Sequence, residues 1–323
     1  MQLYKHDIRQ FKASINSEKV IYLNFNYLSH PIEQWWSALP RTTPLHLAKY
    51  QLISLFLEHC RKKDVYYFDK LGTLNISAIC ITHIFHQDCE RLAFVVHEAL
   101  SELFALNDIK YPYEEHKKLY LKPNGVNYKD WGNGYGEITP HSDDLYEEID
   151  SDFLSLTVCR DQTNTPTVFY FPKDILKGFN DEELLRLFDM KVQFISGKNV
   201  NGLKYRERNI VEFNAQQGFK FYLDFRIDNE TGERMRPLNE QDKKLINKMR
   251  KNLSSCPYKK SISETGTFII VANHKVLHAR SQMNLDLELA KKISSQKHQT
   301  STPRLLYRSK GQNAKISENT LRG

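Results

Sequence analysis

The chain has 323 residues, of which 40% are hydrophobic and 12% aromatic, so it is long enough and apolar enough to bury a sizeable core. Its 46 basic and 39 acidic residues give a formal net charge of +7, but the basic runs lack the interleaved aromatic residues that we expect of a nucleic-acid surface. No window approaches 18 uninterrupted apolar residues, and the first residues lack an apolar signal core, so we expect neither a transmembrane helix nor a signal peptide.

The first 130 residues predict a mixture of strand and helix. Residues 19–25 are β-branched and aromatic, which is typical of a strand. Residues 44–62 and 90–106 place apolar side chains at helical spacing and predict two amphipathic helices. Residues 111–131 show little periodicity, so we expect a long loop there.

Short strands dominate the sequence from residue 153 onward. Residues 153–159 alternate, with Leu154, Leu156 and Val158 on one face. Further strands are predicted over 167–171, 192–196, 210–213, 219–225, 267–272 and 304–308, and helices over 181–190 and 239–253. Many short strands with a few helices outside, and no βαβ alternation, predict a mainly β sandwich or barrel with flanking helices.

We expect one domain over residues 1–323. In this division, residues 1–130 pack on a core formed by residues 131–310, with a helical insertion near 239–254. The five cysteines are odd in number, irregularly spaced and without a C-x-x-C pair, which indicates reduced thiols and a cytoplasmic protein rather than a disulfide framework.

The run G-Y-G-E-I-T-P-H-S-D-D over residues 134–144 has His141 and Asp143 at its centre. In an extended strand, residues i and i+2 point to the same face, so this imidazole and this carboxylate can aim at one point. The run N-H-K-V-L-H-A-R over residues 273–280 can supply a second imidazole. Two His and one carboxylate on one face of a metal are typical of non-heme Fe(II) oxygenases. An H-x-D pair by itself also occurs on many solvated loops, so other parts of such a site are needed.

The run R-L-L-Y-R over residues 304–308 provides such a part. Arg304 and Arg308 lie four residues apart beside an apolar pair and follow the second His in chain order. The co-substrate 2-oxoglutarate chelates iron through its keto-acid end and leaves a second carboxylate to be held, which suits the planar fork of a guanidinium better than a lysine. The order His-x-Asp, His, Arg is far more specific than any one of its pieces.

Together with F-L-S-L-T-V-C-R-D over 153–161 and T-P-T over 165–167, these motifs resemble the clavaminate synthase-like Fe(II)/2-oxoglutarate-dependent dioxygenases. Within that group the chain is most similar to the bacterial hydroxylases of free basic amino acids, especially the L-lysine 4-hydroxylases. The resemblance covers residues 130 to 310 and implies a double-stranded β-helix core, the cupin-like jelly roll, with the metal inside.

The resemblance also implies the metal ligands. His141 and Asp143 match the first two, and His278 matches the distal His, which precedes a small residue and an arginine. His274 is the competing candidate. The implied cofactor is Fe(II) and the oxidant O2. Related halogenases have Gly or Ala in place of the carboxylate ligand, so Asp143 implies hydroxylation.

For the organic ligands, the resemblance implies that Arg304, helped by the hydroxyl of Thr167, holds the far carboxylate of 2-oxoglutarate. Arg308 would hold the α-carboxylate of a free amino-acid substrate. A cationic substrate side chain would also need an acidic partner. The sequence offers four candidates for that partner: Glu137, Asp144, Asp224 and Asp228.

The expected activity is therefore hydroxylation of a free basic L-amino acid, L-lysine at C4, coupled to decarboxylation of 2-oxoglutarate to succinate and CO2. L-Arginine or another free amino acid is the alternative substrate. An alternative of another class is a metal-binding jelly roll without oxygenase activity, such as a zinc hydrolase or binder, because two His and one Asp also hold Zn²⁺. We expect a small-molecule substrate and no nucleic-acid or membrane partner, and we leave a homo-oligomer open.

Overall fold

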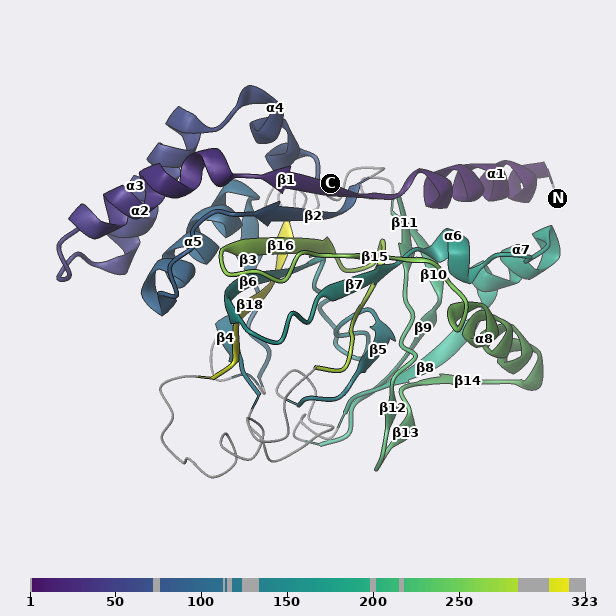
Figure 1. The fold of residues 1–323 in the computed structure, drawn as a ribbon. Helices are drawn as coiled ribbons and strands as arrows, with labels where there is room; N and C mark the ends of the chain where they lie inside the picture. The colour runs from purple at the N-terminus through teal and green to yellow at the C-terminus, as the bar shows by residue number, and fades with distance from the viewer. Residues whose placement is uncertain are drawn as a thin grey trace.

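Two groups of helices flank a set of β-sheets (Figure 1). The computed structural model describes residues 2–71, 76–112, 114, 118–123, 134–197, 202–214, 218–283 and 302–313. The helices are α1 (Gln2–Ser17), α2 (Asn26–Ala38), α3 (Leu45–His59), α4 (Lys62–Val65), the 3₁₀ helix η1 (Tyr66–Asp69), α5 (Glu90–Leu103), α6 (Pro172–Ile175), α7 (Asp181–Asp189) and α8 (Glu240–Leu253). The strands are β1 (Lys19–Asn24), β2 (Ile76–Thr82), β3 (Leu106–Asp108), β4 (Lys118–Leu121), β5 (Ile138–His141), β6 (Phe153–Asp161), β7 (Thr167–Tyr170), β8 (Lys191–Ile195), β9 (Tyr205–Asn209), β10 (Val211–Asn214), β11 (Gly218–Phe221), β12 (Ile227–Asp228), β13 (Gly232–Glu233), β14 (Met235–Pro237), β15 (Tyr258–Lys260), β16 (Thr267–Ala272), β17 (Leu277–Arg280) and β18 (Arg304–Asn313).

Two facing sheets form the centre of the fold. In the described part of the chain, the larger sheet has the order β1-β2-β16-β6-β18-β3, with β4 also paired to β18, and the smaller has the order β15-β7-β17-β5. A buried apolar cluster contains Leu154 and Leu156 from β6, Ile269 from β16 and Phe169 from β7. Because this cluster draws side chains from both sheets, their inner faces pack against each other.

The helices cover the outside of these sheets in two groups, which Figure 1 shows at opposite ends of the view. Leu28 of α2, Phe56 of α3 and Val96 of α5 share a core with Phe268 of the larger sheet. The second group, α1 with α6, α7 and α8, packs on the small sheets formed by β8 to β11 and β14. The predicted mainly β fold with flanking helices is therefore confirmed.

Helical and strand periodicity predicted several of the helices and strands at about their observed positions. The helices predicted over 44–62, 90–106, 181–190 and 239–253 are α3, α5, α7 and α8. The strand predicted over 219–225 ends at Phe221, because the next residues cross to the smaller sheet, where the Phe225 amide donates to the Pro140 carbonyl. Part of the loop predicted over 111–131 forms β4, and residues 124–131 lie outside the described residues.

The elements that the sequence analysis missed include α1, α2, β2 and β9. Strand β2 is buried along its whole length between β1 and β16, so its residues show no polar and apolar alternation. Helix α2 contains Pro31, which weakened its helical pattern. Within the described residues, no helix combines the length and the apolar character that a membrane crossing requires.

Glu18, between α1 and β1, predicts a pH dependence of stability. Its side chain is buried and accepts a hydrogen bond from the Ser77 hydroxyl. Burial raises its pKa from 4.5 to about 7, although Lys275 and the Ser77 bond partly oppose the shift. Because the folded carboxyl binds its proton more tightly than the unfolded one, this stabilisation is full below pH 4.5 and is lost as the pH rises through about 7.

Replacing Glu18 with Gln should therefore raise the melting temperature at pH 8, where the wild type has to bury a charged carboxylate, and change it little near pH 5. The expected gain in the free energy of unfolding at pH 8 is at most about 3 kcal/mol, because a shift of one pKa unit corresponds to about 1.4 kcal/mol. Thermal unfolding at both pH values measures it, with the exposed Glu58→Gln as the control. If the substitution raises the melting temperature no more at pH 8 than at pH 5, or lowers it at pH 8, the prediction is wrong.

Candidate functional site

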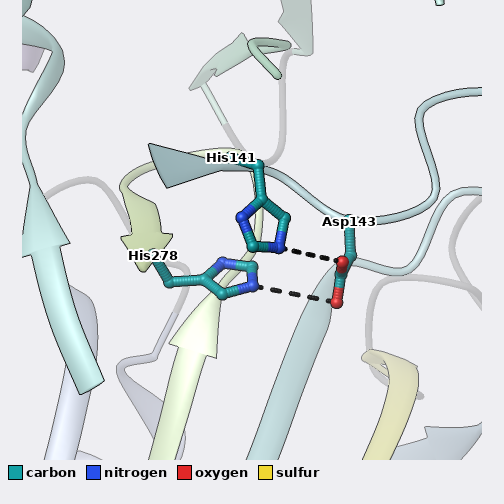
Figure 2. A group of neighbouring side chains, drawn as sticks. All are labelled: His141, Asp143 and His278. Atoms are coloured by element: carbon teal, nitrogen blue, oxygen red, sulfur yellow. Dashed lines mark ion pairs between the residues drawn. The ribbon is translucent and has the colours of Figure 1, made fainter. Parts of the chain in front are cut away.

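Three side chains from two distant parts of the sequence, His141 with Asp143 and His278, lie close together (Figure 2). His141 ends β5 and lies directly opposite His278 of β17, so the two imidazoles are brought together by strand pairing. Asp143 Oδ1 lies 3.3 Å from His141 Nε2, and Asp143 Oδ2 lies 3.7 Å from His278 Nε2. One ligand atom from each of the three lies within 4.8 Å of the others, which suits a single metal ion.

Asp143 reaches this position differently from the prediction. Strand β5 ends at His141, so Asp143 lies beyond it and its carboxylate is not aimed by strand alternation. Instead, Asn273 fixes the backbone of Asp143: its Oδ1 accepts from the Asp143 amide at 2.8 Å, and its Nδ2 donates to the Asp143 carbonyl at 3.0 Å. The two side chains of the H-x-D motif therefore do meet, but strand alternation is not what brings them together.

The protonation states at the cluster suit metal binding. His141 Nδ1 donates to the Thr139 carbonyl at 2.8 Å, which leaves the lone pair of Nε2 facing the carboxylate. Burial lowers the pKa of His278 to about 3, so its imidazole is neutral at ordinary pH. Burial alone would raise the pKa of Asp143, but the positive charge of Lys310 holds it well below its usual range. Imidazole nitrogens turned toward an anionic carboxylate form a donor set that fits a divalent cation.

His274, the competing candidate, lies elsewhere. It is buried, its ring packs 4.7 Å from that of Tyr222, and it does not belong to the cluster. Among the described residues, neither of its ring nitrogens has a hydrogen-bond partner. Of the two imidazoles that the sequence left open, it is His278 that the structure brings to His141 and Asp143.

A cavity of about 120 Å³ lies beside the cluster. Its described lining combines apolar side chains with four arginines. The lining residues are Leu121, Ile138, His141, Asp143, Leu154, Leu156, Thr167, Arg226, His278, Ala279, Arg280, Arg304, Leu306 and Arg308. Thr167, Arg304 and Arg308, which the sequence analysis singled out, all reach the cavity that the metal-ligating cluster lines.

Arg304 is held in place by strand β6. Its Nε donates to Asp161 Oδ2 at 3.0 Å, and its Nη2 donates to the Thr165 carbonyl at 3.3 Å. Asp161 is the partner of Arg304 in the β18–β6 register and has a fully buried side chain. Burial lowers the pKa of Arg304 and Asp161 opposes that shift, so the pair keeps a charged guanidinium at the cavity wall.

Arg308 follows on the same face of β18, as the even spacing predicts. Its Nη2 donates to Glu114 Oε1 at 2.6 Å. Glu114 therefore supplies an ionic partner for Arg308 within the protein. Two residues further along, Lys310 Nζ donates to Asp144 Oδ1 at 2.6 Å and lies 3.9 Å from Asp143 Oδ2.

The four acidic candidates for a substrate cation are not part of the described cavity wall. Glu137 is exposed, and Asp144 accepts from Lys310. Asp228 accepts from the amides of the turn that follows it. Asp224 is buried and accepts from Arg226 Nε and Nη2 at 2.8 and 2.7 Å. Burial explains these pairings, since a buried carboxylate is costly without a cationic or hydrogen-bonding partner.

Sequence reasoning missed four residues at the site. Asn273 holds the backbone of Asp143, Lys310 lies close to its carboxylate, and Arg226 and Arg280 line the cavity. Lys310 could have been predicted from the sequence, because its even spacing from Arg304 and Arg308 places it on the same face of the strand. Arg280 Nη2 donates to the carbonyls of Gly134 and Gly136, so it ties the glycine-rich run to β17.

No protein-family model matches the sequence, and no curated protein sequence matches it. The structure, in contrast, is similar to solved structures of non-heme iron oxygenases. The oxygenase OrfP in complex with Fe and alpha-ketoglutaric acid matches with a TM-score of 0.64 at 14% identity, over 94% of this chain and 98% of that chain. OrfP in complex with Fe, succinate and (3S)-hydroxy-L-Arg matches with a TM-score of 0.65 at 14% identity, over 94% and 97%.

A second oxygenase gives the same result. Asparagine oxygenase in complex with Fe(II), 2S,3S-3-hydroxyasparagine and succinate matches with a TM-score of 0.64 at 13% identity, over 90% of this chain and 92% of that chain. The chain has the fold of these oxygenases. The predicted jelly-roll core is therefore confirmed, while sequence identities this low show the fold alone.

Proposed function

We propose that the chain is an Fe(II)/2-oxoglutarate-dependent hydroxylase of a free L-amino acid. The observation that carries this proposal is the cluster of His141, Asp143 and His278 in the cavity that Arg304 also lines, within this fold. The solved relatives support the class of reaction, since OrfP is seen with Fe, succinate and a hydroxylated arginine, and asparagine oxygenase with Fe(II), succinate and a hydroxylated asparagine.

His141 and His278 would hold the iron through Nε2, and Asp143 through its carboxylate. Bound iron, with 2-oxoglutarate and O2, supplies the oxidising power for hydroxylation of a C–H bond, and 2-oxoglutarate becomes succinate and CO2. The Thr139 carbonyl orients His141, Asn273 orients Asp143, and Lys310 keeps the Asp143 carboxyl ionised. A carboxylate in this position leaves no vacancy for a halide, which favours hydroxylation.

Arg304 is the proposed partner of the far carboxylate of 2-oxoglutarate. Asp161 and the Thr165 carbonyl hold its guanidinium at the cavity wall before the co-substrate arrives, so little side-chain freedom is lost on binding. The hydroxyl of Thr167, which lines the same cavity, would add a hydrogen bond to that carboxylate. Charge-assisted pairs of this kind are among the stronger hydrogen bonds in proteins.

Arg308 is the proposed partner of the substrate α-carboxylate. Glu114 positions its guanidinium from one side, and the cavity lies on the other. Leu121, Leu156 and Leu306 line the same cavity, and such apolar side chains would keep water away from the reacting C–H bond.

Among free amino acids, the sequence motifs favour L-lysine, hydroxylated at C4, with L-arginine as the alternative. In that reading Glu137 or Asp224 would receive the cationic end of the side chain. Glu137 is exposed and Asp224 is paired with Arg226, so the lysine assignment depends on the resemblance of the motifs and not on the shape of the cavity.

A free α-carboxylate should be essential. With Fe(II), 2-oxoglutarate and O2, a panel of L-amino acids should reveal one whose addition releases succinate and yields a product heavier by one oxygen atom. The α-amide of that amino acid should have a kcat/KM about 30- to 1000-fold lower, equivalent to about 2–4 kcal/mol, because Arg308 loses its contact with the substrate carboxylate. If the amide, or the same residue within a peptide, is hydroxylated equally well, the chain is instead an oxygenase of peptides or proteins.

A further inference from the structure

One cavity arginine, Arg226, has no role in the proposed function. Its Nη1 lies 3.7 Å from Asp143 Oδ1, so a guanidinium lies directly beside the metal-ligating cluster. The side chain is 8% exposed and contributes to the cavity wall. A buried cation needs an ionic partner, which Arg226 has in Asp224.

Asp224 fixes the orientation of this guanidinium. It accepts from Arg226 Nε and Nη2, while Nη1, on the other side of the fork, is the atom near Asp143. The backbone of Asp224 also forms a bridge to that of His141, so the ion pair is anchored to a proposed metal ligand. The arrangement therefore holds one side of a guanidinium rigidly and directs the other toward the cluster.

The carboxylate of Asp224 already has ionic partners within the protein. Arg234 Nε lies 3.9 Å from Asp224 Oδ2, in addition to the two bonds from Arg226. These contacts commit the Asp224 carboxylate to two arginines of the protein. A substrate cation near Asp224 would therefore also lie close to the guanidinium of Arg226.

The charges that line the described cavity also disfavour a cationic substrate side chain, because most of them are positive. Arg226, Arg280, Arg304 and Arg308 line it, and the one carboxylate in the described lining is Asp143, a proposed metal ligand. Arg304 and Arg308 account for two carboxylates, of the co-substrate and of the amino acid, and Arg280 donates to the Gly134 and Gly136 carbonyls. The group left to meet the substrate side chain next to the metal is Arg226.

We propose that the substrate side chain ends in an oxygen acceptor, a carboxylate or a carboxamide, and that Arg226 binds it. This inference rests on the proposed function and replaces lysine by an acidic amino acid or its amide. A guanidinium offers N–H groups in a planar fork that matches a carboxylate or an amide oxygen. An ammonium or guanidinium terminus in the same place would meet a like charge inside a buried site.

Anaerobic calorimetry on the protein loaded with Fe(II) and 2-oxoglutarate tests the substrate class. L-Aspartate, L-asparagine, L-glutamate and L-glutamine are compared with L-lysine and L-arginine, and turnover is followed in parallel. We expect the best acceptor-bearing amino acid to bind at least about tenfold more tightly than either basic one, a difference of about 1.4 kcal/mol. Tighter binding and faster hydroxylation of lysine or arginine would overturn the inference and leave the proposed function intact. Failure of 2-oxoglutarate itself to bind would overturn both, and the same titrations detect it.

A paired variant tests Arg226 itself. Arg226→Gln combined with Asp224→Asn removes both charges without leaving a buried carboxylate unpaired. It should lower kcat/KM for the acceptor-bearing substrate by about 10- to 100-fold, since one charge-assisted contact contributes about 1.5–3 kcal/mol, while the KM for 2-oxoglutarate stays unchanged. The matched control is Arg186→Gln with Asp242→Asn, a bidentate pair of 2.9 and 3.2 Å remote from the cavity.

Arg226→Lys provides a second test that does not depend on folding of the double variant. It keeps the charge beside Asp224 and loses the planar fork, so the preference for acceptor-bearing substrates should narrow but persist. Thermal unfolding establishes that each variant is folded at the assay temperature. A preference among amino acids that neither variant alters would overturn the role of Arg226.

Discussion

His278→Ala is expected to abolish turnover and to weaken Fe(II) binding by more than about 100-fold. Loss of a partner that only orients a metal ligand commonly costs about 10- to 100-fold in metal affinity, so loss of a ligand costs more. His141→Ala and Asp143→Ala should behave in the same way, because all three supply atoms to one cluster. Anaerobic titration with Fe(II) measures the affinity, and substrate-dependent release of succinate measures turnover.

His274→Ala is the matched control on the same stretch of chain. Its ring packs on Tyr222 and takes no part in the cluster, so this variant should keep substantial activity per folded molecule even if its melting temperature falls. An inactive His274→Ala beside an active His278→Ala would reverse the assignment of the distal ligand.

Arg304→Ala is expected to raise the KM for 2-oxoglutarate by about 30- to 1000-fold, because a charge-assisted and bidentate contact of about 2–4 kcal/mol is lost. The KM for the amino acid should change far less. Steady-state kinetics with each substrate varied in turn separates the two effects, and Arg308→Ala should give the opposite pattern. An unchanged dependence on 2-oxoglutarate would assign the co-substrate carboxylate to Arg308 or Arg280 instead.

Arg304→Ala also leaves Asp161 buried without its guanidinium partner, so part of the effect could come from lost stability. Arg304→Lys separates the two causes. It retains a cation for Asp161 but loses the bidentate fork, so it should restore most of the melting temperature while the KM for 2-oxoglutarate stays raised.

Strands β6 and β16 were predicted although almost every residue in them is buried, and other predicted elements have one buried and one exposed face. Helix α5 and strand β8 show the periodicity of such elements, and both lie where the pattern placed them. Strand β2 has both faces buried, so its apolar run carries no periodicity that distinguishes a strand from a buried helix. The helical insertion was found because α8 is charged on one side and has a consistent apolar stripe on the other.

The site was predictable where its residues follow one another along a strand, and less so where they meet by tertiary packing. Arg304 and Arg308 share a face of β18 because their spacing is even. The pairing of Asp224 with Arg226 and Arg234 depends on how the chain turns after β11, which local sequence patterns do not encode. For that reason Asp224 was a candidate for a substrate cation in the sequence and is the support of an arginine in the structure.

The binding of Fe(II) and 2-oxoglutarate at the cluster can be measured by an anaerobic titration followed in the visible spectrum. A weak charge-transfer band should appear when both Fe(II) and 2-oxoglutarate are present, and should be absent when either is omitted or when Asp143 is replaced by Ala. A zinc hydrolase or a simple metal binder would not show this band. If the wild-type protein binds Fe(II) but gives no band with 2-oxoglutarate, and no amino acid releases succinate, the chain is not a 2-oxoglutarate-dependent oxygenase.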